Sequence, residues 1–117
     1  MIIHNAWQLD FNMILSFFEP NIQATRNLID LGRACADASS LRILFTSSVG
    51  IASSWDRTLG EYPETIVEEA KYAIGGGYGE AKYVAERVSY WFQFEPSNFM
   101  DHIRFWQRAD FKVAPLE

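Results

Sequence analysis

The feature that most limits the fold is a short apolar segment, Leu41 to Phe45, which is broken only by Arg42 and ended by Thr46-Ser47-Ser48. Such a run, bounded by turn-forming residues, is typical of a strand buried on both faces. It follows a segment of helical periodicity, and Ile2-Ile3 predict another short strand at the start of the chain. Strand, helix, strand is the order of the parallel crossover unit. We therefore expect an α/β fold with a parallel sheet.

Two long helices are expected. The first runs from about Glu19 to Ala38, with Pro20 where a helix begins or kinks. The apolar residues that set its period are Ile14, Phe17, Phe18, Ile22, Leu28, Leu31, Ala34 and Cys35. The second runs from Tyr78 to Phe94, and its apolar side carries Tyr83, Val84, Val88 and Trp91.

The end of the chain differs from the rest. The segment from Phe99 to Phe111 has Phe99, Ile103 and Trp106 at helical spacing and leads into a short tail. We divide the chain into residues 1–94, which form the α/β domain, and residues 95–117, a helical or tail segment. With 117 residues and 49% hydrophobic content, the chain has material for one modest domain.

Charge and cysteine content narrow the classes of function. Ten basic and fifteen acidic residues give a net charge of -5, and the basic residues are scattered, so neither nucleic acid nor a membrane surface is expected as a partner. No apolar stretch approaches the roughly 20 residues that span a bilayer. The single cysteine, Cys35, excludes an internal disulfide and is expected to be a small buried residue. A cytoplasmic, reducing location fits best.

A tyrosine and a lysine four residues apart suggest the chemistry. On a helix, Tyr78 and Lys82 share one face. A neighbouring ammonium favours the phenolate and lowers the pKa of the phenol, which makes tyrosine a usable general acid. Reduction of a carbonyl by hydride needs such a donor for the oxygen. The same spacing also arises by chance on amphipathic helices.

Ser48 follows the central strand, and strand ends in open parallel sheets are where ligands bind. Its hydroxyl would contact a substrate oxygen, or it would satisfy backbone groups in a turn. Ser47 is the alternative, because adjacent strand residues face opposite ways. The run Gly75-Gly76-Gly77 lacks the spacing of a phosphate loop and introduces the second helix instead. His4 and His102 have no metal-ligand spacing, and each is interpreted as an ordinary polar or packing residue.

Five segments, in order, resemble the C-terminal thioester reductase domain of fungal adenylate-forming enzymes that are similar to non-ribosomal peptide synthetases. These domains belong to the extended short-chain dehydrogenase/reductase superfamily. The segments are Ile2-Ile3-His4-Asn5-Ala6-Trp7 with Asp10-Phe11-Asn12, Phe18-Glu19-Pro20-Asn21, Thr25-Arg26-Asn27-Leu28-Ile29-Asp30, Leu44-Phe45-Thr46-Ser47-Ser48-Val49-Gly50, and Gly77-Tyr78-Gly79-Glu80-Ala81-Lys82-Tyr83-Val84-Ala85-Glu86-Arg87. The resemblance covers roughly residues 2 to 90.

The resemblance implies an active site and a cofactor. Ser48 would polarise the substrate carbonyl, Tyr78 would give the proton, and Lys82 would lower the pKa of Tyr78 and hold the nicotinamide ribose. The segment His4-Asn5-Ala6 would pass the cofactor at a strand end, and Asn21 matches the asparagine that begins the family's next helix. Such domains use NADPH to release a carrier-bound thioester as an aldehyde, in secondary metabolism, and some continue to the alcohol. No metal is implied.

The family begins with a strand and a glycine-rich turn that this chain lacks. The expected fold is therefore a partial Rossmann-like, doubly wound parallel sheet without the N-terminal dinucleotide-binding crossover units, and with only two strands. Two functions stay open. One is an NADPH-dependent reductase, or its remnant, acting on a thioester or aldehyde held by an acyl or peptidyl carrier protein. The other is a catalytically inactive, truncated protein that binds a partner or itself through an exposed sheet edge.

Overall fold

The computed structural model describes residues 1–35, 41–63, 65–93 and 103–106. The main elements, in order, are strand β1 (Ile2–His4), helix α1 (Glu19–Arg33), strand β2 (Ile43–Thr46), helix α2 (Gly77–Gln93) and strand β3 (Ile103–Trp106). Short 3-10 helices lie between them: η1 (Leu15–Phe18), η3 (Val49–Ala52), η4 (Arg57–Leu59) and η5 (Ala70–Tyr72). The two long helices and the first two strands are confirmed, although α1 ends at Arg33, before the expected Ala38.

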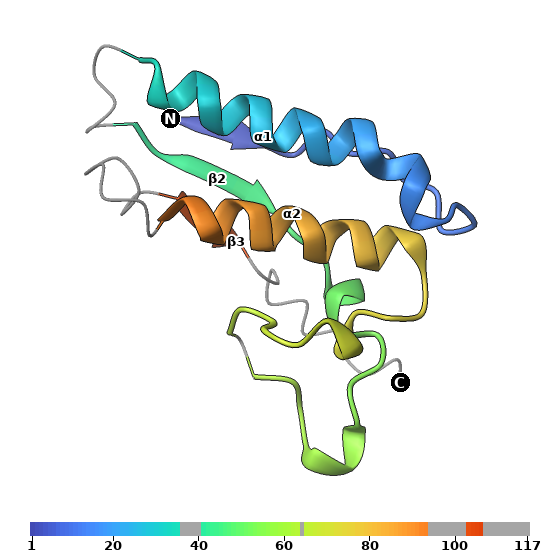
Figure 1. Ribbon diagram of the computed structural model, residues 1–117. Helices are drawn as coiled ribbons and strands as arrows, with labels where there is room; N and C mark the ends of the chain where they lie inside the picture. The colour runs from blue at the N-terminus through green and yellow to red at the C-terminus, as the bar shows by residue number, and fades with distance from the viewer. Residues whose placement is uncertain (36–40, 64, 94–102, 107–117) are drawn as a thin grey trace, which may run out of the picture.

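The strands form one parallel sheet in the order β1-β2-β3. Ile2 lies opposite Ile43 in the first pair, and Phe45 lies opposite Phe105 in the second. Because α1 connects β1 to the parallel β2, the predicted strand-helix-strand crossover is confirmed, and with it the α/β class (Figure 1).

The third strand corrects the prediction for the end of the chain. Residues 103–106 pair with β2 as a strand, whereas helical spacing had predicted a helix from Phe99 to Phe111 and a sheet of two strands. A short apolar segment fits either period, and pairing with an open strand edge decides in favour of the strand. The rest of that segment, and the expected domain boundary between residues 94 and 95, lie outside the described residues.

Both helices lie on the same side of the sheet, as Figure 1 shows. The core between them contains Ile29 of α1, Ile43 of β2 and Phe92 of α2. Side chains alternate along a strand, so Ile3 faces the other side and is 58% exposed, and Leu44 beside it is half-buried. The prediction that β2 is buried on both faces was therefore wrong, because no described helix covers the second face.

Helix α1 has the predicted period but a different buried stripe. Pro20 occupies its first turn, where a fixed φ and a missing N–H are tolerated. Within the helix the buried residues are Thr25, Ile29 and Gly32. Leu31, which was expected in the core, is 59% exposed.

Cys35 is exposed, which corrects the prediction that it is buried. It lies four residues after the exposed Leu31 and therefore on the same side of the chain, and its thiol donates to the Leu31 carbonyl at 3.4 Å.

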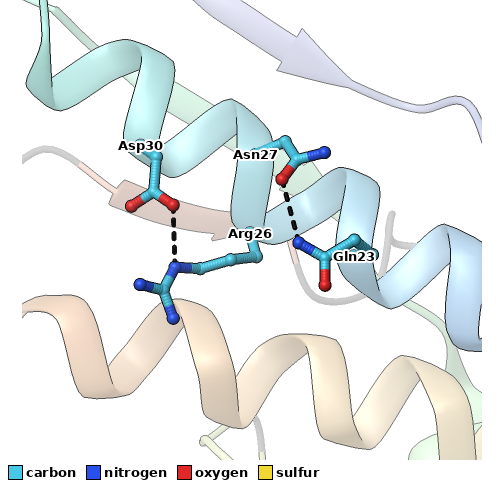
Figure 2. Close-up of polar contacts among 4 residues, drawn as sticks. All are labelled: Gln23, Arg26, Asn27 and Asp30. Carbon is cyan, nitrogen blue, oxygen red and sulfur yellow. Dashed lines mark hydrogen bonds and ion pairs between the residues drawn. The ribbon is translucent and has the colours of Figure 1, made fainter.

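Helix α1 carries two partly exposed polar pairs, each joining residues one turn apart (Figure 2). Arg26 donates to Asp30 at 3.0 Å, and Gln23 donates to Asn27 at 2.9 Å. The Arg26 guanidinium also lies 4.4 Å from the centre of the Phe92 ring, so it covers the junction between α1 and α2. Exposed pairs of this kind add only a few tenths of a kcal/mol each, roughly 0.3 to 0.5.

Helix α2 packs through small and polar side chains. Its residues that expose less than a tenth of their surface include Ala81, Lys82, Ala85, Glu86, Ser89 and Phe92. Trp91, expected on the apolar side, is 71% exposed. Alanine at two successive turns lets the helix axis approach the sheet closely, and this orientation takes Lys82 into the interior. Within the described residues, no helix is long and apolar enough to cross a membrane.

Candidate active site

The candidate site lies where β2 ends and the first turn of α2 passes beside it. The chain leaves β2 through Thr46-Ser47-Ser48 and turns at once into η3. Ser48 has extended backbone angles, and its Oγ accepts a hydrogen bond from the Gly50 amide at 3.1 Å. This N-cap contact fixes the Ser48 side chain at the carboxyl end of the strand.

Two glycines bring α2 into contact with this turn. A Cβ atom at Gly79 would lie 2.3 Å from the Gly50 carbonyl oxygen, and one at Gly77 would lie 2.3 Å from the Met13 carbonyl oxygen. Real Cβ atoms do not approach so closely, so only glycine fits at either position. The first turn of α2 is thus held between two backbone segments, and Tyr78 lies between the two glycines.

Tyr78 is half-buried, and its phenol lies near enough to the Ser48 side chain for a hydrogen-bond interaction to act on its pKa. Its ring packs edge-on against Phe11 at 4.9 Å and Phe18 at 6.0 Å between ring centres. Burial raises the pKa of the Tyr78 phenol, while the hydrogen bond to Ser48 opposes that rise. The lowering of the pKa of Tyr78 by Lys82 stays a prediction.

The Lys82 amine lies closer to other groups than to the Tyr78 ring. Its Nζ donates to the Thr46 carbonyl at 2.7 Å and lies 5.9 Å from the centre of the Tyr78 ring. Two other rings are closer: Nζ is 4.2 Å from the centre of Trp7 and 4.8 Å from that of Phe45. Lys82 is only 2% exposed. Desolvation lowers the pKa of Lys82 to about 8, although the nearby Glu86 carboxylate favours the charged form.

His4 faces helix α1. Its Nε2 lies 3.0 Å from Thr25 Oγ1, and that hydroxyl donates in turn to the Asn21 carbonyl at 3.1 Å. Because the threonine proton is used there, His4 Nε2 is the donor in this pair. Burial lowers the pKa of His4, and the Lys82 charge lowers it further. The interpretation of His4 as a packing residue agrees with these contacts, and His102 lies outside the described residues.

The structure brings Ser48, Tyr78 and Lys82 together at one strand end and leaves Asn5 and Ala6 exposed after β1. Of the two serines that sequence left open, Ser48 makes the contact with Tyr78. Ser47 Oγ is buried and has no hydrogen-bond partner among the described residues. The contacts of Lys82 with the Trp7 ring and the Thr46 carbonyl were not predicted from the sequence. An aromatic residue in a loop and a backbone oxygen produce no sequence pattern that would reveal such contacts.

A surface hollow of about 480 Å³ lies elsewhere. Its lining residues are Tyr62, Thr65, Ile66, Glu68, Glu69, Tyr72 and Tyr90. None of them is a predicted site residue. The convergence of a phenol, a hydroxyl and an amine therefore marks the candidate site better than the volume of the hollow does.

The chain is similar to parts of several proteins that are named as reductases. It is 53% identical over 89 residues to adenylate-forming reductase Nps11 of Serpula lacrymans and 40% identical over 87 residues to adenylate-forming reductase Nps10 of Heterobasidion annosum. It is 36% identical over 87 residues to a carboxylic acid reductase of Neurospora crassa. These matches cover 74 to 75% of the chain and 8% of each relative. No protein-family model matches.

The chain therefore spans a small part of each of these curated relatives, and all three are named as reductases. The resemblance found from the residues is confirmed by these relatives, which match about three quarters of the chain. Over the three quarters of its length that match, the chain belongs to the same family as a segment of the fungal adenylate-forming reductases.

Proposed function

We propose that the chain carries the proton-donating part of a reductase site that acts on a carrier-bound thioester or aldehyde with NADPH. The observation that supports this most is the contact of the Tyr78 side chain with Ser48, with Lys82 one helical turn away, at the carboxyl end of β2. The names of the relatives support reduction as the class of reaction. The fold we propose is part of a Rossmann-like, doubly wound sheet of the short-chain dehydrogenase/reductase type.

The residues at the strand end fit the nicotinamide end of such a cofactor. Besides the Tyr78 hydroxyl and the Lys82 amine, two buried polar atoms, Trp7 Nε1 and Ser47 Oγ, have no hydrogen-bond partner among the described residues. Buried polar atoms of this kind are expected to have a partner, and the amide and ribose hydroxyls of NADPH offer both donors and acceptors. The segment His4-Asn5-Ala6, in which His4 is buried and the other two residues are exposed, would border the cofactor. When bound, NADPH supplies the hydride.

The residues of the chain have separate roles in this proposal. Ser48 orients the substrate oxygen by a hydrogen bond, and Tyr78 gives that oxygen its proton as negative charge develops on it. Because burial raises the pKa of Tyr78, the phenol keeps its proton at neutral pH and donates it only when the substrate oxygen has become strongly basic, as an alkoxide is. Once it has donated, the ammonium of Lys82 stabilises the phenolate. For a thioester, the carbon–sulfur bond then breaks to give an aldehyde and a free thiol on the carrier.

The proposal is tested with the full chain, NADPH and an acyl thioester of a carrier-protein mimic. We expect loss of nicotinamide absorbance together with formation of an equal amount of aldehyde. Lys82→Met should weaken cofactor binding, measured by nicotinamide fluorescence, while the circular dichroism spectrum stays the same. No absorbance change, combined with no measurable cofactor binding, would reject the reductase function. A cytoplasmic location stays a prediction.

A second candidate function is favoured by the open face of the sheet. Ile3 is 58% exposed on the side that neither α1 nor α2 covers, and β1 is an edge strand of the described sheet. Apolar surface beside an unpaired edge is a common route to association. If the chain acts by binding a partner or itself, light scattering on the purified protein should give a mass above 13.4 kDa, whereas a stable monomer contradicts self-association.

A further inference from the structure

Lys82 is the only described residue of the candidate site whose charge is almost fully removed from water. Its side chain is 2% exposed, and its one hydrogen bond among the described residues goes to an uncharged carbonyl, that of Thr46. An ammonium has three donors and is strongly hydrated, so burial of this kind needs compensation. The nearby Glu86 carboxylate provides part of it, and an aromatic ring that the proposed mechanism does not use provides a second source.

That source is the ring of Trp7. The loop after β1 places the indole so that the Lys82 Nζ lies 4.2 Å from its centre, closer than to Phe45 at 4.8 Å or Tyr78 at 5.9 Å. All three distances fall within the roughly 6 Å over which a ring attracts a cation, and tryptophan is the strongest of the three ring types. The indole is itself fixed by a stacked contact with Phe18, at 6.5 Å and 16°, and an edge contact with Phe45.

We propose that Trp7 is a positioning residue that holds the Lys82 ammonium at the end of β2 through a cation–π contact. Trp7 thereby keeps the amine both charged and directed toward the Thr46 carbonyl, one turn from Tyr78. Its importance for catalysis rests on the proposed function, but its effect on Lys82 does not. Trp7 need not touch the substrate for this role.

Other charges near Lys82 are few. The titratable groups that face it are His4 from β1 and Glu86 and Tyr78 from α2, while β2 contributes the uncharged Thr46 carbonyl and the Phe45 ring. Burial of His4 keeps it neutral at pH 7, so it adds no competing cation. The pKa of Lys82 is lowered to about 8, which is close to neutral pH. A change in the attraction between the Trp7 ring and the Lys82 ammonium therefore changes the fraction of Lys82 that is charged near neutral pH.

The test is an NMR titration of the full chain with lysine labelled at Cε. Lysine occurs at positions 71, 82 and 112, and Lys82→Arg assigns the signal of interest. In Trp7→Leu, which keeps apolar cover but removes the ring, we expect the pKa of Lys82 to fall by about one pH unit, a tenfold loss of proton affinity. Trp7→Phe keeps a weaker ring and should give a smaller fall.

The direction of the shift separates two roles. If Trp7 only shields Lys82 from water, its removal admits water and the pKa of Lys82 rises or stays the same, which would overturn the proposal. Trp91→Leu is the matched control: Trp91 is 71% exposed and makes no described contact with Lys82, so its substitution should leave the Lys82 titration unchanged. The Lys71 signal provides a reference in each spectrum.

A second measurement avoids any loss of folding. Tryptophan replaced throughout by fluorinated analogues keeps its shape but has a less negative ring face. The pKa of Lys82 should fall stepwise with the number of fluorine atoms. A pKa that does not change on fluorination contradicts the proposal. Because the readout is a titration, this result stands whether or not the chain reduces a thioester. If turnover is observed, the alkaline limb of its pH–rate profile should shift in the same variants. If the chain is inactive but the Lys82 titration shifts as expected, only the reductase function is refuted.

Discussion

Substitution of Gly79 by alanine should separate α2 from the end of β2. The added Cβ would lie 2.3 Å from the Gly50 carbonyl oxygen and 2.8 Å from its carbon, both backbone atoms that cannot rotate away. Ordinary contact needs about 1 Å more, so the first turn of α2 and η3 must move apart by about that distance. Overpacking of this kind costs about 1 to 3 kcal/mol, which exceeds the roughly 1 kcal/mol that alanine contributes inside a helix.

The matched control lies three residues earlier. A Cβ at Gly76 would meet nothing within 4 Å, and its φ lies outside the left-handed region. Gly76→Ala should therefore leave the free energy of unfolding within about 0.5 kcal/mol of wild type or raise it slightly, because alanine restricts the unfolded chain.

Urea unfolding followed by circular dichroism measures both variants. Gly79→Ala should lower the free energy of unfolding by about 1 to 2 kcal/mol more than Gly76→Ala does. A movement of about 1 Å also takes Tyr78 away from Ser48, so any reductase activity should fall much more than stability does. If the two alanine variants unfold alike, the close contact between α2 and η3 does not exist as described, and the argument for how Tyr78 is positioned fails.

Two further predictions follow from the lowered pKa values. The pKa of Lys82 is about 8 in the folded chain and 10.5 in the unfolded chain, so between these pH values the unfolded chain binds one more proton. As pH rises through this range, the free energy of unfolding of wild type should therefore increase by up to about 3 kcal/mol relative to that of Lys82→Met. If the difference between the two proteins does not change with pH, the amine is not buried. The pKa of His4 is lower in the folded chain than its ordinary value of 6.5, so protonation below about pH 6.5 favours the unfolded chain. In thermal unfolding, wild type should therefore lose stability relative to His4→Gln as pH falls. Parallel pH curves for the two proteins would show that His4 is not buried.

The sequence was sufficient for the crossover unit because its signals are local and agree with one another. An apolar run ended by Thr46-Ser47-Ser48 and a periodic segment with Pro20 in its first turn leave few alternatives to β2 and α1. The end of the chain had no such agreement. Residues 103–106 fit a helical or an extended period, and pairing with β2 decided between them.

The side of each helix that faces the core was harder to predict than the helix itself. In α2 the buried stripe runs through Ala81, Lys82 and Ala85, and the exposed Trp91 lies outside it, because close packing on the sheet favours small residues over large ones. The candidate site shows the same limit. The spacing of Tyr78 and Lys82 predicted their shared position, but the direction of the Lys82 amine depends on Trp7 and the Thr46 carbonyl, which lie far away in sequence.

The proton donor is the central claim, and removing one oxygen atom tests it. Tyr78→Phe deletes the hydroxyl that contacts Ser48, and Tyr83→Phe deletes a hydroxyl of the same helix that donates to the Glu68 carbonyl at 3.0 Å, away from the site. In an assay of NADPH oxidation with an acyl thioester, Tyr78→Phe should lower the rate by about 10² to 10⁴ and Tyr83→Phe should leave it unchanged. Equal rates in wild type and Tyr78→Phe would contradict the account.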